Sequence, residues 1–247
     1  MQIEAVYQNP DSSFNDMVKI LEKDPLLTAD ILKAANSPLY GFSREINAIS
    51  QAVGLFGMGT VRGFALASIV KKSFTLDLSP YGINNEMFSA LSKKQHGLII
   101  AWCLKKENKL LGILSPAAFL VEIGKVLIAQ QIITEKKIPL FRDALKELQN
   151  VEAAERKIVG VDAPEVSATI FAQWRFEERL VNVIKHCQKP EEANQEDRKP
   201  ASILHVVRVA VPMNGLITDA SIAAAKELIT KYGLDMESFD KAIENAR

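Results

Sequence analysis

Apolar residues recur at helical spacing along most of this chain, and no run of alternating apolar and polar residues predicts a strand. The pattern is clearest between residues 24 and 35, where Asp24 can cap a helix and Pro25 suits its first position. The apolar face of this helix consists of Leu27, Ile31 and Ala34 or Ala35. Pro38 should follow its end, because a residue before proline is disfavoured in the α region. We therefore expect an all-α fold.

Two more helices follow closely and complete a compact N-terminal unit. The first should begin near Ser50 and end at Gly57, and the second should run from Gly59 through Ile69. Gly57 suits a helix end because glycine readily adopts the left-handed conformation found there. Upstream, a serine and an aspartate three residues apart, at positions 13 and 16, predict the capped start of another helix.

The rest of the chain is also predicted to be helical. The expected helices cover residues 84–105, 115–133, 139–150, 163–174, 177–187, 201–211, 218–232 and 236–246. Ser115 and Pro116 predict a helix start, a capping hydroxyl followed by proline, and the apolar run after them predicts a helix buried on most sides. Residues 189–199 are polar and lack periodicity, so we expect a loop there. Trp102 and Trp174 are expected to anchor the core.

A connector divides the chain into two helical halves. Pro80-Tyr81-Gly82 marks it within residues 75–85. We expect an N-terminal half at residues 1–80 and a second half at residues 81–212. The two amphipathic helices within residues 213–247 should pack on the same domain.

Composition narrows the class of protein further. The chain has 247 residues, 48% of them hydrophobic, which is enough for a sizeable core. Basic and acidic residues both number 30, and this balance gives no support to a nucleic-acid partner. Cys103 and Cys187 lie in apolar helical contexts and indicate reduced core thiols. The start of the chain is not typical of a signal peptide and the apolar runs are too short to span a bilayer, so we expect a cytoplasmic protein without a membrane partner.

Residues in and around the first helices form a longer, ordered motif. They are Asp24-Pro25, Leu32, Ala35-Asn36-Ser37, Tyr40-Gly41, the run from Ile49 to Ala52, Leu55, Gly57 and Val61-Arg62. The motif resembles the HDOD family, the non-catalytic, HD-related output domains of bacterial signalling proteins, and with later helices the resemblance spans roughly residues 1–212. It implies an HD-domain or phosphodiesterase-like bundle with an N-terminal helical subdomain. The family usually has an apolar, proline-containing helix before this region, which we expect to be shortened or absent here.

The resemblance also locates the positions at which related enzymes bind metal. HD-type phosphohydrolases use a first histidine, a His-Asp pair and a final aspartate, and such ligands suit a divalent ion that activates water. These positions fall on His96, Val121, Glu122 and Arg208. Valine offers no ligand atom and arginine repels a divalent ion, whereas a catalytic metal needs about three protein ligands. We therefore expect no metal, cofactor or catalytic residue, and an ion pair between Glu122 and Arg208 instead.

The other histidines and the glycine-rich stretch favour structural interpretations. His96 and His205 lie among apolar residues and are expected to be hydrogen-bonded core histidines, whereas His186 suits a helix end. The stretch Gly57-Met58-Gly59 lacks the spacing and the preceding strand of a dinucleotide-binding loop.

The function implied by the resemblance is signal output or regulation through protein contacts, without catalysis. The partner would be a separate signalling protein of a two-component, chemotaxis or cyclic-dinucleotide pathway, because the chain carries no receiver, kinase or cyclase module. The corner at Asn36, Ser37, Tyr40 and Gly41 is the candidate interaction surface. The alternative for Asn36 and Ser37 is that they only cap and end helices.

Two other functions stay open. In one, the former metal pocket binds a nucleotide or another anion through Lys125, Arg208 and His205, and the chain is a small-molecule sensor. In the other, Glu122 and His96 support a residual metal-dependent phosphohydrolase activity.

Overall fold

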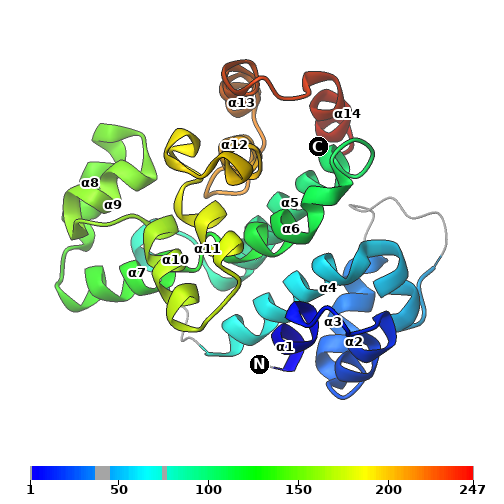
Figure 1. Cartoon of the computed structure of the whole chain (residues 1–247). Helices are drawn as coiled ribbons and strands as arrows, with labels where there is room; N and C mark the ends of the chain where they lie inside the picture. Colours follow the sequence, from blue (N-terminus) through cyan, green and yellow to red (C-terminus); the bar gives the residue numbers. More distant parts are fainter. Residues whose placement is uncertain (1, 37–44, 74–76, 247) are drawn as a thin grey trace.

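The computed structural model describes residues 2–36, 45–73 and 77–246, and every regular element within these ranges is a helix (Figure 1). The all-α prediction is therefore confirmed for this part of the chain. The α-helices are α1 (Gln2–Gln8), α2 (Phe14–Leu21), α3 (Pro25–Ala35), α4 (Ile49–Ser73), α5 (Asn85–Cys103), α6 (Leu111–Leu120), α7 (Gly124–Thr134), α8 (Ile138–Leu148), α9 (Val151–Val159), α10 (Ala163–Gln173), α11 (Glu178–Lys185), α12 (Gln195–Ala210), α13 (Asp219–Tyr232) and α14 (Met236–Ala246). The short 3-10 helices are η2 (Ser79–Tyr81), η3 (Asn108–Leu110) and η4 (Pro190–Glu192).

The N-terminal helices start and break where the sequence predicts. Asp24 caps α3, because its Oδ1 accepts a hydrogen bond from the Leu27 amide at 3.0 Å. Ser13 and Asp16 form the predicted capping box at the start of α2. Helix α4 is interrupted at Gly57, whose φ of 78° lies in the left-handed region that favours glycine. The two helices predicted on either side of this glycine are thus the two arms of α4.

Helix α4 packs across α6 with their backbones in direct contact, and this contact joins the two predicted halves. A Cβ atom on Gly59 would lie 2.5 Å from Gly112 Cα, and one on Gly63 would lie 2.9 Å from Pro116 Cα. Any larger residue at these positions would push the helices apart. One continuous apolar core then extends from α1 to α14, with members from all three predicted segments. The boundaries at residues 80 and 212 stay a prediction.

Helix α6 differs from the helix predicted to start at Ser115. It begins at Leu111, contains Pro116 and ends before a turn at residues 121–123, so the predicted helix over residues 115–133 is wrong. The Ser115 hydroxyl bonds the ring of His96 and caps no helix. Packing overrides the local start signal, because Ser115 and Pro116 are both buried in the core.

The apolar stretch Asn108–Thr134 is long and apolar enough to cross a membrane by length and composition. Its most apolar window has a mean hydropathy of 1.8, but 89% of that window is buried inside the protein. The core helices of a globular protein have the same properties, so the stretch is weak evidence for a membrane span.

Two further predictions in the second half are wrong. The polar segment 189–199 contains η4 and the start of α12, where Asp197 accepts a hydrogen bond from Arg179 Nε at 2.9 Å. Such polar contacts order a segment without any apolar periodicity. Trp102 is a core anchor as predicted, 4% exposed and donating to the Asp235 carbonyl, but Trp174 is 42% exposed. Trp174 follows directly after α10, and its ring contacts that of Phe171 edge-on at a centroid distance of 6.0 Å.

Helices α8 and α9 form a hairpin at one side of the molecule, on the left in Figure 1. Together with α7 and the start of α10 the hairpin has a small apolar cluster, which is separate from the main core. Its members are Ile128, Ile132, Phe141, Ala144, Ala154 and Ala163. Charged side chains of α9 and Arg142 on α8, which donates to the Ser79 carbonyl at 2.8 Å, also connect the hairpin to the bundle.

Candidate functional site

His96, at the first of the former metal positions, is a neutral core histidine. It lies on α5 and is 0% exposed, with its ring stacked on Phe119 at a centroid distance of 4.3 Å and edge-on to Phe64 at 4.9 Å. Nε2 is 2.7 Å from the Ser115 hydroxyl. Burial lowers the pKa of His96 to about 3. The prediction of a hydrogen-bonded core histidine is confirmed.

The second and third positions, Val121 and Glu122, lie in the turn between α6 and α7, which α10 holds in place. The Ser167 hydroxyl donates to the Val121 carbonyl at 2.9 Å and accepts from the Gly124 amide at 2.7 Å. A Cβ atom on Gly124 would lie 2.1 Å from the Ala163 carbonyl oxygen, so only glycine allows this approach. Val121 is fully buried and presents no polar atom from its side chain.

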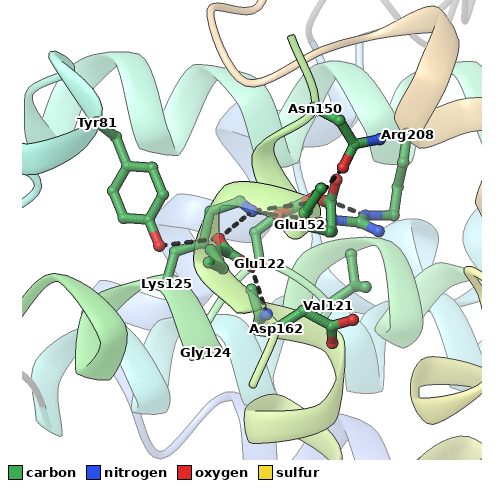
Figure 2. Close-up of polar contacts among 12 residues, drawn as sticks. Tyr81, Val121, Glu122, Gly124, Lys125, Asn150, Glu152, Asp162 and Arg208 are labelled. Carbon is green, nitrogen blue, oxygen red and sulfur yellow. Dashed lines mark hydrogen bonds and ion pairs between the residues drawn. The ribbon is translucent and has the colours of Figure 1, made fainter. Parts of the chain in front are cut away.

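Glu122 and the fourth position, Arg208, form the predicted ion pair. Arg208 Nε donates to Glu122 Oε1 at 2.7 Å, and Nη2 lies 3.2 Å from Oε2 (Figure 2). Burial opposes the ionisation of Glu122, but Arg208 and Lys125 outweigh it and hold the pKa of Glu122 at about 2. The prediction of this pair is confirmed, and both side chains are nearly inaccessible to water.

The ion pair belongs to a larger group of charges, the Arg208 cluster, which consists of Glu122, Lys125, Glu152, Glu155 and Arg208. Arg208 Nη2 also donates to Glu152 Oε1 at 2.6 Å. Lys125 Nζ lies 2.9 Å from Glu155 Oε1, 3.3 Å from Glu122 Oε2 and 3.6 Å from Glu152 Oε1. The cluster therefore joins the turn after α6, α7, α9 and α12, as Figure 2 shows.

Sequence reasoning missed Glu152 and Glu155. Both lie on α9, three residues apart and therefore on one face of the helix, and both turn toward the bundle. Glu155 accepts further hydrogen bonds from the Tyr81 hydroxyl at 2.8 Å and from the Ala163 amide at 2.7 Å. Burial raises the pKa of Glu155 in spite of Lys125. In the sequence, only their three-residue spacing on α9 could have indicated that both face the same neighbour.

Gln95 lies one residue before the core histidine and contacts the same cluster. Its Nε2 donates to the Val211 carbonyl at 3.2 Å and lies 3.4 Å from Glu122 Oε1. Gln95 is 1% exposed, and its Oε1 has no hydrogen-bond partner within the described residues. Most buried polar atoms are paired, so this oxygen is an exception that needs a reason.

The residues predicted to bind an anion lie partly together. Lys125 and Arg208 share the cluster, where each contacts more than one carboxylate. His205 is half-buried on the same helix as Arg208, and its Nδ1 is 2.9 Å from the Tyr232 hydroxyl. Burial and the charge of Arg208 lower the pKa of His205 to about 4. Neither cation is left over for an anion in this arrangement, so the anion pocket stays a prediction without support from the geometry.

The residues present do not fit the metal centre of HD enzymes. His96 is packed between aromatic rings, Val121 has no ligand atom and Arg208 contacts Glu122. Over residues 2–36, 45–73 and 77–246, no group of three or more His, Cys, Asp and Glu side chains could hold a metal ion. Two of the four former positions thus carry groups that cannot bind a cation.

Only one residue of the predicted interaction surface can be placed. Asn36 ends α3, and its Nδ2 donates to the carbonyls of Leu32 and Ile46, whereas its Oδ1 accepts from the Ile46 amide at 2.8 Å. It therefore ties the two ends of the intervening segment together. Ser37, Tyr40 and Gly41 lie outside the described residues, and the surface stays a prediction.

A second buried arginine forms the Arg62 cluster, which consists of Glu4, Tyr7, Arg62 and Glu177. Arg62 is 0% exposed and holds Glu4 through two hydrogen bonds, of 2.9 and 2.6 Å. Its Nη1 donates to Glu177 Oε2 at 2.9 Å, and its guanidinium lies 4.1 Å from the centre of the Tyr7 ring. Arg62 belongs to the motif quoted above, but neither glutamate could be assigned to it from the sequence. The cluster fastens α1 and the start of α11 to α4.

Solved structures with the same fold span almost the whole chain. A virulence factor from Campylobacter jejuni subsp. jejuni is 27% identical with a TM-score of 0.60, over 99% of this chain and 93% of the other. A candidate phosphohydrolase from Shewanella amazonensis SB2B is 22% identical with a TM-score of 0.70, over 99% and 87%. A candidate signal transduction protein from Marinobacter aquaeolei VT8 is 21% identical with a TM-score of 0.66, and this chain spans 55% of its length.

The match to a family model is more direct. Comparison with curated proteins gives no significant match. The model of the HDOD domain, however, matches residues 1–190 of the 247. Its match includes His96, Val121 and Glu122 and ends before Arg208. With the helical fold and the motif around Asn36, this match shows that the chain belongs to the HDOD domain family.

Proposed function

We propose that this chain is a non-catalytic signalling domain that acts through contacts with a separate protein. The observation that carries the proposal is the 2.7 Å ion pair between Arg208 and Glu122, two residues that the resemblance assigns to the metal positions of HD enzymes. Membership of the HDOD family supports a signalling role, as does the fold shared with the candidate signal transduction protein from Marinobacter aquaeolei VT8.

Converting the Arg208 cluster into a metal site would require a large rearrangement. A divalent ion at Glu122 would lie beside the guanidinium of Arg208, so the arginine would have to leave. The guanidinium would then lose its hydrogen bonds to Glu122 and Glu152. Metal binding at this position would therefore have to offset the loss of these contacts, which opposes metal-dependent hydrolysis.

A domain without chemistry of its own must act by binding. A rigid helical bundle presents helix faces and corners, which partner proteins recognise through helices or loops. The partner in this proposal is a separate bacterial protein of a two-component, chemotaxis or cyclic-dinucleotide pathway, and the site of action is the cytoplasm. The corner that follows α3 remains the candidate surface.

The proposal is tested by purifying the full chain without chelator, measuring its metal content, and following the hydrolysis of nucleotides and cyclic nucleotides by chromatography of the products, with Mg²⁺, Mn²⁺ or Zn²⁺ added. We expect less than one metal ion per ten chains and no product above the buffer blank, with an active HD phosphohydrolase as the positive control. Stoichiometric metal and a hydrolysis that Glu122→Gln abolishes would establish the enzyme instead. A nucleotide that raises the melting temperature without being hydrolysed would favour a sensor.

A further inference from the structure

The Arg208 cluster holds more carboxylates than cations. The carboxylates are those of Glu122, Glu152 and Glu155, and the cations are those of Lys125 and Arg208. The side chains of all five are at most 19% exposed, so water screens their charges only weakly. An uncompensated charge away from water is costly, and a buried carboxyl group in such surroundings takes up a proton more readily than it does in water.

Glu122 and Glu152 are the poorer candidates for this proton. Oε1 of Glu122 lies 2.7 Å from Arg208, and its Oε2 lies 3.2 Å from Arg208 and 3.3 Å from Lys125. Glu152 contacts the same two cations and is the most exposed of the three carboxylates. Burial opposes their ionisation, but Arg208 and Lys125 outweigh it, holding the pKa of Glu122 at about 2 and lowering that of Glu152. Both groups therefore stay ionised near neutral pH.

Glu155 has a different set of contacts. Its Oε1 lies 2.9 Å from Lys125 Nζ and 2.8 Å from the Tyr81 hydroxyl, and its Oε2 accepts from the Ala163 amide at 2.7 Å. Glu155 is 0% exposed. A hydroxyl both donates and accepts, so Tyr81 can turn and accept a proton carried by Glu155, which an ammonium or an amide N–H cannot do. Burial raises the pKa of Glu155 in spite of Lys125.

The balance of charge around Glu155 is negative. The titratable and charged side chains on the elements packed near it are Tyr81 on η2, Glu122 in the turn after α6, Lys125 on α7, Glu152 on α9 itself and, in contact with Glu152, Arg208 on α12. Asp162, just before α10, is paired with Arg156 at 2.8 Å. Lys125 divides its charge among Glu122, Glu152 and Glu155, so it compensates Glu155 only in part.

Glu155 also lies where the α8–α9 hairpin meets η2. Beside the bond from the Tyr81 hydroxyl, the Phe141 ring on α8 lies edge-on to the Tyr81 ring at a centroid distance of 5.1 Å, and Arg142 donates to the Ser79 carbonyl at 2.8 Å. The apolar cluster of the hairpin is separate from the main core. An ionised Glu155 gains from water that the docked hairpin excludes, so its ionisation favours opening of this contact.

We propose that the folded chain binds one proton at Glu155, next to the Tyr81 hydroxyl, and that loss of this proton as the pH rises loosens the α8–α9 hairpin from η2. The direction follows from linkage. Because the pKa of Glu155 is raised in the docked hairpin, its contribution to docking is fully present below the ordinary value near 4.5 and is lost as the pH rises through the raised value. The hairpin is thus a pH-sensitive element, which goes beyond the proposed function and does not depend on the partner.

The first test locates the proton. The carboxyl carbon of Glu155 is assigned by nuclear magnetic resonance in the isotope-labelled full chain and followed from pH 3 to pH 9. We expect its titration midpoint to lie at least one pH unit above the ordinary value near 4.5, whereas that of Glu147, an exposed glutamate on α8, should lie close to the ordinary value. A Glu155 midpoint at or below the ordinary value would overturn the proposal, and this measurement needs no substitution.

The second test measures the hairpin. Hydrogen exchange of α9 amides, corrected for the intrinsic pH dependence of exchange, gives the opening constant at pH 5 and at pH 8. The ratio of the two constants should be larger in the unchanged chain than in Glu155→Gln, by about tenfold for each unit by which the pKa is raised. His205 and the other titratable groups are the same in both proteins, so the comparison isolates Glu155. The matched control, Glu147→Gln, should respond to pH as the unchanged chain does.

Equal ratios in the unchanged chain and in Glu155→Gln would show that no proton at Glu155 holds the hairpin, and would overturn the second half of the proposal even if the titration midpoint is raised. A loss of the pH response in Glu147→Gln as well would place its cause elsewhere in the hairpin. Neither result bears on the metal content or the hydrolysis assays, so this proposal and the proposed function fail independently.

Discussion

Two arginines are buried in the part of the chain that the structure describes, Arg62 and Arg208, and they bind carboxylates in similar ways but differ in their access to water. Arg62 lies between Glu4 and Glu177, and the side chain of Glu177 is 30% exposed, so water shares its charge. Arg208 lies between Glu122 and Glu152, which are 3% and 19% exposed, and a further cation and carboxylate surround them. Loss of an arginine should therefore be more harmful in the Arg208 cluster than in the Arg62 cluster.

The two clusters also have different positions in the fold. The Arg62 cluster fastens α1 and the start of α11 to α4, and so connects the N-terminal helices with the second half. The Arg208 cluster includes two of the positions that the resemblance assigns to the metal site of HD enzymes, and it anchors the α8–α9 hairpin through Glu152 and Glu155. One cluster therefore joins the halves of the bundle, whereas the other fastens the α8–α9 hairpin to the bundle.

The largest effect is expected from Arg208→Met. The change leaves Glu122 and Glu152 buried with Lys125 as their one cation, and should lower the free energy of unfolding by about 3–5 kcal/mol. Urea denaturation followed by circular dichroism measures the loss. Arg198→Met on the same helix is the matched control, since that exposed arginine donates one hydrogen bond, to the Ala193 carbonyl, and should cost less than about 1 kcal/mol. Equal losses would show that the cluster is not a special site of charge.

Acidification tests the contribution of the Arg208 cluster to stability without substituting any of its residues. The pKa of Glu122 is lowered to about 2, so its ion pairs contribute fully above the ordinary value near 4.5 and are lost as the pH falls toward 2. The contribution should amount to about 3 kcal/mol. Glu155, whose pKa is raised, acts in the opposite direction, because its folded form binds a proton more readily. Urea midpoints at pH 6, 4.5 and 3 should fall more steeply for the unchanged protein than for Glu122→Gln; parallel curves would contradict this assignment.

Arg62→Met should have a smaller effect, about 2 kcal/mol, because Glu177 can turn to water and Glu4, which loses its two hydrogen bonds from Arg62, keeps the one from Gln8 at 2.9 Å. Arg62→Lys should lower the free energy of unfolding by less than Arg62→Met does, because lysine keeps the charge but cannot bind Glu4 with two parallel hydrogen bonds. Hydrogen exchange should localise the effect to α1. A loss as large as that of Arg208→Met would remove the distinction between the clusters.

The sequence predicted those features of the fold that depend on neighbouring residues. The caps at Asp24 and Ser13 and the break at Gly57 all follow from local backbone chemistry, and all are found. The start predicted at Ser115 is wrong because burial in the core decides where α6 begins. The prediction that Trp174 is a core anchor is wrong for a similar reason, because apolar character alone does not tell whether a residue at a helix end faces inward.

The contacts of the candidate site were predictable only where the resemblance indicated that residues far apart in the sequence lie close together in space. Glu122 and Arg208 are 86 residues apart, and their pairing could be inferred because both occupy former metal positions. Glu177 is 115 residues from Arg62, and no local pattern connects them. Glu152 was missed for the same reason, as only the fold brings α9 close enough to α12 for Glu152 to contact Arg208. Long-range ion pairs are a product of the fold, so a sequence pattern does not contain them.

The smallest effect is expected where charges pair in full contact with water. Glu147 on α8 and Lys157 on α9 are 2.7 Å apart, a distance similar to those in the buried clusters, but their side chains are 63% and 47% exposed. Glu147→Gln should therefore change the free energy of unfolding by less than about 0.5 kcal/mol, because water replaces the lost partner. The same urea titration measures it, at low and at high salt. A loss above about 1 kcal/mol would mean that hydrogen-bond length, not burial, ranks the ion pairs of this molecule, and the contrast between Arg62 and Arg208 would then need another cause.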